Sequence, residues 1–184
     1  MEDKLIKNSV IFSGSKDGDG AYLNLAYELG EKLASNGFTV VNGGGPGLMD
    51  KVAKGAFENG GKVVGVHWQI DGRELSRFNT ETLTFSELRP RQNKLLSLAD
   101  AYIALPGGIG TVFELYEILV KKYLGEIEKD TPIFLLGKDF WENFVLLAEK
   151  QITRGFVEES FKEYFTVVDS VAEVLFDLNN SNNK

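Results

Sequence analysis

Short apolar runs alternate with amphipathic stretches of helical length along the whole chain, and this alternation is the feature that most restricts its fold. The apolar runs lie at residues 10–12, 39–41, 62–66, 102–105, 132–136 and 165–168. Between them, apolar side chains recur at helical spacing, as Tyr22, Ala26, Leu29 and Leu33 do. Strands separated by helices of roughly 10–15 residues form right-handed βαβ units, which build a parallel sheet. The sequence therefore predicts a doubly wound, Rossmann-like α/β fold, with a mostly parallel sheet and helices on both faces.

The chain of 184 residues shows no internal repeat and no linker, so we expect one domain spanning residues 1–184. A helix is expected over residues 111–124, and a stretch without clear periodicity, residues 67–87, is expected to form a binding loop with a short strand at 83–85. The polar residues 179–184 are expected to fray.

Composition excludes several kinds of site. The chain has no cysteine and a single histidine, His67, which excludes disulfides, thiol catalysis and zinc sites built from several histidines. We expect neither a metal ion nor a cofactor. The net charge of −7 disfavours a nucleic-acid partner. No apolar run approaches the roughly 20 residues that span a bilayer, and no apolar leader precedes the first strand, so we expect a cytoplasmic protein without a membrane partner.

Small residues follow three of the apolar runs. They are Ser13 and Gly14 after the first run, Gly44 and Gly45 after the second, and Gly107, Gly108, Gly110 and Thr111 after the fourth. The carboxyl ends of parallel strands meet at one edge of the sheet, where glycine amides and helix N-termini favour an anion. The pattern favours a phosphorylated ligand, although each loop could also serve packing alone. Neither G-x-G-x-x-G nor G-x-x-x-x-G-K-[ST] occurs, which disfavours a hydride-transfer enzyme and a P-loop ATPase.

Charged side chains near the third of these loops allow two interpretations. Glu114 and Glu117 lie three residues apart, and therefore on one helix face, where they could carry catalysis. Thr111 and Glu114 also fit a T-x-x-E capping box, which would satisfy the amides at the start of a helix. Arg91 opens the preceding predicted helix and could be either a site residue or an ordinary solvated surface charge.

The sequence LPGGIGTVFE at residues 105–114 is similar to the P-G-G-x-G-T-x-x-E signature of the LONELY GUY (LOG) family. The segments SGS at 13–15, GGGPGLM at 43–49 and VGV at 64–66 also follow the order of that family, and the resemblance covers roughly residues 9–136. It implies hydrolysis of the N-glycosidic bond of a nucleoside 5′-monophosphate, AMP or its N6-prenylated form, to free base and ribose 5-phosphate. It also implies a homodimer.

The resemblance assigns roles to individual residues. Arg91 and Glu114 match the family's catalytic pair, the loop at 107–111 would hold the 5′-phosphate, and Glu117 could hold a ribose hydroxyl or assist the attacking water. Where this chain has Gln92 and Phe113, the family usually has a lysine and a glutamate. Members have also been labelled lysine decarboxylases, but no lysine here stands out for pyridoxal phosphate.

Two alternatives to hydrolysis remain at this point. Molybdenum-cofactor carriers resemble the same family and bind a ligand without hydrolysing it, so a carrier of that cofactor or of a nucleotide is one alternative. A binder of single-stranded nucleic acid on a Rossmann-like fold is another, which the acidic composition disfavours.

Overall fold

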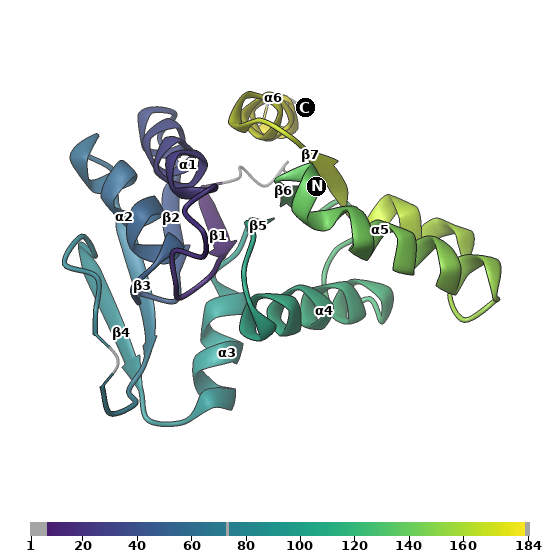
Figure 1. Cartoon of the computed structure of the whole chain (residues 1–184), viewed down its shortest axis with the longest axis horizontal. Coiled ribbons are helices and arrows are strands. Elements are labelled where there is room, and N and C mark those ends of the chain that lie inside the picture. The colour runs from purple at the N-terminus through teal and green to yellow at the C-terminus, as the bar shows by residue number, and fades with distance from the viewer. Residues whose placement is uncertain (1–6, 73, 183–184) are drawn as a thin grey trace.

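In residues 7–72 and 74–182, which this computed structural model describes, seven strands form one sheet in the order β4-β3-β2-β1-β5-β6-β7 (Figure 1). The strands are β1 (Asn8–Phe12), β2 (Thr39–Asn42), β3 (Val63–Trp68), β4 (Glu81–Phe85), β5 (Ala101–Ala104), β6 (Ile133–Leu136) and β7 (Thr166–Val168). The helices are α1 (Leu23–Ser35), α2 (Leu48–Glu58), α3 (Leu88–Ser97), α4 (Ile109–Tyr123), α5 (Lys138–Thr153) and α6 (Val171–Asn182), with a 3₁₀ helix at Glu159–Tyr164. Every described strand pair is parallel, so the predicted fold class is confirmed.

Apolar cores lie on both faces of the sheet, because successive strand residues point to opposite sides. Along β1, Val10 and Phe12 pack into a core with residues of α3, α4 and α5, whereas Ile11 packs into a core with α1, α2 and α6. Figure 1 shows α1 and α6 on one side of the sheet and α3 and α4 on the other. Each helix therefore buries one apolar stripe, as the helical spacing predicted.

The direction of winding reverses between β1 and β5, which are neighbours in the sheet but far apart in the chain. From β1 the chain moves to β2 and β3 on one side, and from β5 it moves to β6 and β7 on the other. In open parallel sheets, ligands bind in the crevice outside the carboxyl ends of the strands at such a reversal. The loops after β1 and β5 therefore face the position where a ligand is expected.

Several predicted boundaries are wrong. The stretch at 67–87, expected to be a loop with a short strand at 83–85, contains the end of β3 and all of β4. The helix expected over residues 111–124 begins two residues earlier, at Ile109, because Gly108 already adopts the extended conformation that precedes a helix. Residues 179–182, expected to fray, continue α6, where Leu178 is fully buried and the Ser181 hydroxyl donates to the Asp177 carbonyl. Residues 183–184 lie outside the described residues. None of the helices in the described part of the chain is both long and apolar enough to cross a bilayer.

Candidate active site

A buried ion pair joins α3 to α4 at the carboxyl edge of the sheet. The guanidinium of Arg91 donates from Nη1 to Glu114 Oε1 at 2.8 Å and from Nε to the carbonyl oxygen of Val66, near the end of β3, at 2.9 Å. The two side chains are 10% and 13% exposed, so water screens the pair little. The interpretation of Arg91 as a solvated surface charge is therefore wrong.

Glu114 does not cap the helix that carries it. The N-cap of α4 is Gly108, no side chain hydrogen-bonds there, and Thr111 lies inside the first turn. A capping box needs the hydroxyl residue at the N-cap itself, so the capping interpretation of Thr111 and Glu114 is wrong. The Glu114 carboxylate is held by Arg91 instead, and it lies one helical turn beyond Thr111.

A second ion pair connects the same two helices. Arg89 donates from Nη1 to Glu117 Oε1 at 3.0 Å, but the Arg89 side chain is 69% exposed whereas that of Glu117 is 12% exposed. The other carboxylate oxygen, Glu117 Oε2, is buried and has no hydrogen-bond partner among the described residues. Burying a polar oxygen without a hydrogen-bond partner is costly, which is consistent with a position that a ligand completes.

The loop after β5 is packed on one side and open on the other. A methyl group on Gly107 would lie 2.1 Å from Thr111 Oγ1 and 2.9 Å from the Gly14 nitrogen, so these three predicted site residues come together. At Gly108 and Gly110, by contrast, a methyl group would meet no atom within 4 Å, and neither residue has a left-handed φ. The first amides of a helix have no partner inside it. The open side of this loop therefore presents unpaired N–H groups at the positive end of α4.

Hydrogen bonds to neighbouring segments hold the loop after β2 in place. The Gly44 amide donates to Asn42 Oδ1 at 2.8 Å, and its carbonyl accepts from the Ser76 amide at 2.9 Å and from Asn79 Nδ2 at 3.3 Å. Gly44 has a φ of 66°, a conformation that side chains with a Cβ rarely adopt. Its backbone thus fastens the segment before β4, and its predicted contact with a ligand stays a prediction, as does that of Gly45.

Other predicted and unpredicted residues complete the site. Ser13, at the end of β1, is buried and its hydroxyl has no partner among the described residues. Gly43 is not among the site residues predicted from the sequence, and a methyl group there would lie 2.6 Å from Arg91 Nη2. The glycine-rich run pointed to that loop, but only the folded chain places its first glycine against the arginine.

Tyr22 lies at the start of α1 and connects it to the first turn of α5. Its hydroxyl donates to Asp139 Oδ2 at 2.6 Å. The hydrogen bond to Asp139, with a smaller contribution from burial, raises the pKa of Tyr22 to about 12. The phenol therefore stays protonated at neutral pH.

The described residues contain no group of three or more histidine, aspartate or glutamate side chains that could hold a metal ion. Buried polar atoms that lack a hydrogen-bond partner among the described residues include Ser13 Oγ, Glu117 Oε2 and, on α3, Gln92 Nε2. Hydroxyl, carboxylate and amide groups of this kind bind the hydroxyls and phosphate of a small organic ligand.

Comparison with known proteins identifies relatives over most of the chain. The model of a family described as "Possible lysine decarboxylase" matches residues 49–178. A cytokinin riboside 5′-monophosphate phosphoribohydrolase of rice, LOG, is 31% identical over 91% of this chain and 71% of its own length. Its Arabidopsis thaliana counterpart LOG1 is 31% identical over 92% of this chain and 81% of its own. The molybdenum cofactor carrier protein of Chlamydomonas reinhardtii shares the fold, with a TM-score of 0.70, 22% identity, and coverage of 98% of this chain and 100% of its own.

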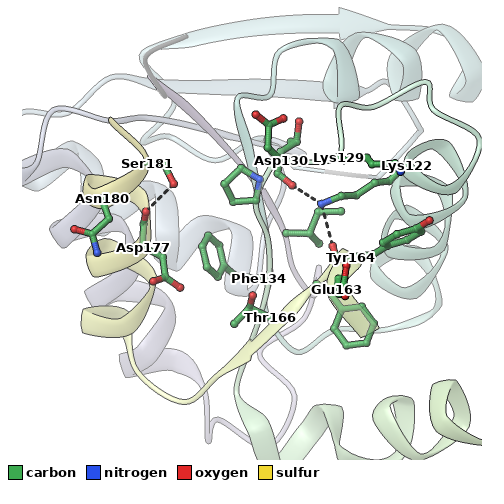
Figure 2. A pocket seen from close by; sticks show the side chains of 14 residues that line it. Lys122, Lys129, Asp130, Phe134, Glu163, Tyr164, Thr166, Asp177, Asn180 and Ser181 are labelled. Atoms are coloured by element: carbon green, nitrogen blue, oxygen red, sulfur yellow. Dashed lines mark hydrogen bonds between the residues drawn. The ribbon is translucent and has the colours of Figure 1, made fainter. Parts of the chain in front are cut away.

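The description of that family raises the question of whether a lysine here could hold pyridoxal phosphate. Lys122 is buried, and burial lowers the pKa of its amine. However, its Nζ donates to the carbonyls of Thr131 and Tyr164 at 2.7 and 3.3 Å, beside a cavity of about 690 Å³ at the amino ends of β6 and β7 (Figure 2). These two hydrogen bonds engage the amine, and it lies at the edge of the sheet opposite the glycine loops. Lys122 therefore does not fit a Schiff base with that cofactor.

Proposed function

Because the chain belongs to the LOG family of phosphoribohydrolases, we propose that it hydrolyses the N-glycosidic bond of a nucleoside 5′-monophosphate to free base and ribose 5-phosphate. AMP and its N6-prenylated form are the substrates we expect. The observation that carries the proposal is the buried Arg91–Glu114 pair, one helical turn from the open N-terminus of α4.

The open N-terminus of α4 suits a phosphate. Unpaired amides and the helix dipole both favour a negative charge at that end. The chain has no P-loop lysine, so backbone amides, with the hydroxyls of Ser13 and Thr111, supply the donors. Gly108 and Gly110 leave the space in which phosphate oxygens approach those amides.

Glu114 supplies the negative charge that the reaction needs. When the bond between C1′ and the base nitrogen breaks, positive charge develops on the ribose ring, as in other glycoside hydrolyses. The carboxylate of Glu114 stabilises this charge and orients a water molecule, whose oxygen bonds to C1′ while its proton is released. The departing base gains a proton at its ring nitrogen, so water is consumed and atoms balance.

Arg91 serves the leaving group or the phosphate without giving up a proton, because arginine stays protonated in proteins. Its Nη1 holds Glu114, and its Nη2 is directed past Gly43. Glu117 Oε2, which lacks a partner among the described residues, accepts a hydrogen bond from a ribose hydroxyl.

A panel of nucleotides tests the proposal. We expect the purified protein to release base and ribose 5-phosphate from AMP or N6-prenyl-AMP, with the rate unchanged by EDTA. Loss of base release in EDTA with recovery in Mg²⁺ would contradict the mechanism. Stoichiometric nucleotide binding without any release of base would favour the carrier alternative instead.

We also propose that the protein is a homodimer that buries an apolar stripe along α4 and its C-cap residue. The stripe consists of Ile109, Phe113, Val120 and Leu124, of which Ile109 is 91% and Leu124 64% exposed. Residues at this spacing share one helix face, and exposed apolar faces of this kind mark interfaces. The family resemblance supplies the occupant, a second copy. Light scattering at micromolar concentration should give twice the monomer mass, and a monomer mass would refute the dimer.

A further inference from the structure

Gln92 is a buried side chain in the site to which no role has been assigned. It is 1% exposed, and its Oε1 accepts a hydrogen bond of 3.0 Å from Arg91 Nη1. Its Nε2 is buried without a hydrogen-bond partner among the described residues. A buried amide with an unsatisfied nitrogen is a poor choice for stability, since an apolar side chain of similar size would avoid the cost.

Three acceptors fix the plane of the Arg91 guanidinium. Nε donates to the Val66 carbonyl on β3, and Nη1 donates both to Glu114 on α4 and to Gln92 on α3 itself. These bonds account for three of the five N–H groups that the guanidinium carries. The remaining two are on Nη2, beside the Cα of Gly43, where the lack of a side chain leaves space.

The chemistry of position 92 matters because Nη1 is shared. A glutamate there would place a second carboxylate on the nitrogen that holds Glu114 and would repel it. A lysine, which the family usually has at this position, would offer no lone pair to the guanidinium, so Arg91 would be held by two acceptors instead of three. An amide oxygen accepts the second Nη1 hydrogen without adding charge, so Glu114 keeps its place as the anionic partner of Arg91.

We propose that Gln92 is a positioning residue, which fixes the rotation of the Arg91 guanidinium so that Nη2 is directed at the ligand. The Gln92–Arg91–Glu114 hydrogen-bond set carries this inference. For its consequence in turnover, it rests on the proposed hydrolysis of nucleoside monophosphates.

Replacement of Gln92 by methionine removes the acceptor and keeps most of the volume. We expect Gln92→Met to melt at or above the parent temperature, and kcat for AMP to fall about 10-fold to 100-fold through misorientation. KM should change less than about threefold, because the phosphate is held by α4. The matched control is Gln151→Met on α5, which should behave as the parent does. A folded Gln92→Met protein with kcat within twofold of the parent would overturn the proposal.

A readout independent of activity is the side-chain ¹⁵N–¹H spectrum of arginine-labelled protein, with the Arg91 signals assigned by their loss in Arg91→Ala. The parent should show hindered rotation of the guanidinium, with separate Nη signals. Gln92→Met should release that rotation, while Gln92→Glu, which keeps an acceptor oxygen, should retain it.

Equal rotation in all three proteins would overturn the proposal even if the parent releases no base. Absence of base release from every nucleotide, with hindered rotation that depends on Gln92, would instead refute the proposed function and leave the positioning role standing. If Gln92→Met does not fold, the smaller apolar variant Gln92→Leu takes its place in both measurements.

Discussion

The loop after β2 and the loop after β5 are both rich in glycine, yet Gly44 in the first and Gly110 in the second differ in backbone conformation and in surroundings. Gly44 has a left-handed φ, and its amide and carbonyl are both hydrogen-bonded inside the protein. Gly110 lies inside α4 without a left-handed φ and has open space around it, although glycine weakens a helix by about 1 kcal/mol relative to alanine. We therefore expect Gly44 to serve the fold and Gly110 to serve the proposed phosphate site.

The largest expected effect belongs to the helix that starts at the open loop. Glu114→Gln keeps the size of the side chain and removes the negative charge that stabilises the ribose cation. We expect kcat for AMP to fall about 10²–10⁴-fold with equilibrium AMP binding nearly unchanged, while the protein stays folded with a lower melting temperature, because the buried Arg91 guanidinium loses its anionic partner. The matched control is Glu126→Gln, which should retain full activity. Glu126 lies beyond the end of α4, and its exposed carboxylate pairs with Lys121 in the last turn of that helix. Turnover of Glu114→Gln within threefold of the parent would remove Glu114 from the chemistry.

Gly44→Ala tests whether the loop after β2 is held by the fold. The alanine backbone would have to adopt a left-handed φ, and its methyl group would lie 3.0 Å from the Cα of Gly65. We expect the free energy of unfolding to fall by about 2 kcal/mol, measured by urea denaturation. A variant as stable as the parent would show that this loop is not held as described.

Gly110→Ala makes the same substitution in the open loop and should have the opposite effect on stability. Alanine favours the helix, so the free energy of unfolding should rise by about 0.5–1 kcal/mol. The methyl group would crowd the phosphate, so AMP binding, measured by calorimetry, should weaken about tenfold, as expected for loss of one charged hydrogen bond. Unchanged AMP affinity would contradict the assignment of the phosphate to this loop.

Tyr102, which lies on β5 outside both loops, carries the smallest effect. Burial, with a smaller contribution from Asp100, raises the pKa of Tyr102 to about 12, above the ordinary value of 10.0. The stability that comes from its protonated hydroxyl, which donates to the Leu96 carbonyl, is therefore present below pH 10 and is lost as the pH rises toward 12. Tyr102→Phe should cost about 1 kcal/mol at pH 7 and less at pH 11, without changing kcat. An equal cost at both pH values would contradict this linkage.

The sequence predicted most of the sheet because most strands are buried apolar runs, and three of these runs, including residues 102–105, are followed by small residues. It also located the glycine loops and Glu114, since these lie in contiguous motifs. Spacing could not decide between capping and catalysis, because the helix begins at Ile109 and only this start excludes a capping box. Only the folded chain shows which residues pair.

The pairing of Arg91 with Glu114 joins residues 23 positions apart on two helices. The family resemblance suggested it, but local periodicity carries no information on such a contact. Gln92 and Gly43 were missed as functional residues for the same reason. Each is an unremarkable residue in its own segment, and each acquires its role from an arginine that the fold brings beside it.

The central claim is that the open loop after β5 binds a 5′-phosphate for hydrolysis beside Glu114. The most direct measurement compares kcat/KM for base release from AMP and from adenosine, on one preparation and with EDTA present. Because the loop offers its unpaired amides to an anion, we predict that AMP is preferred by about 100-fold or more. Comparable values for AMP and adenosine would contradict the account.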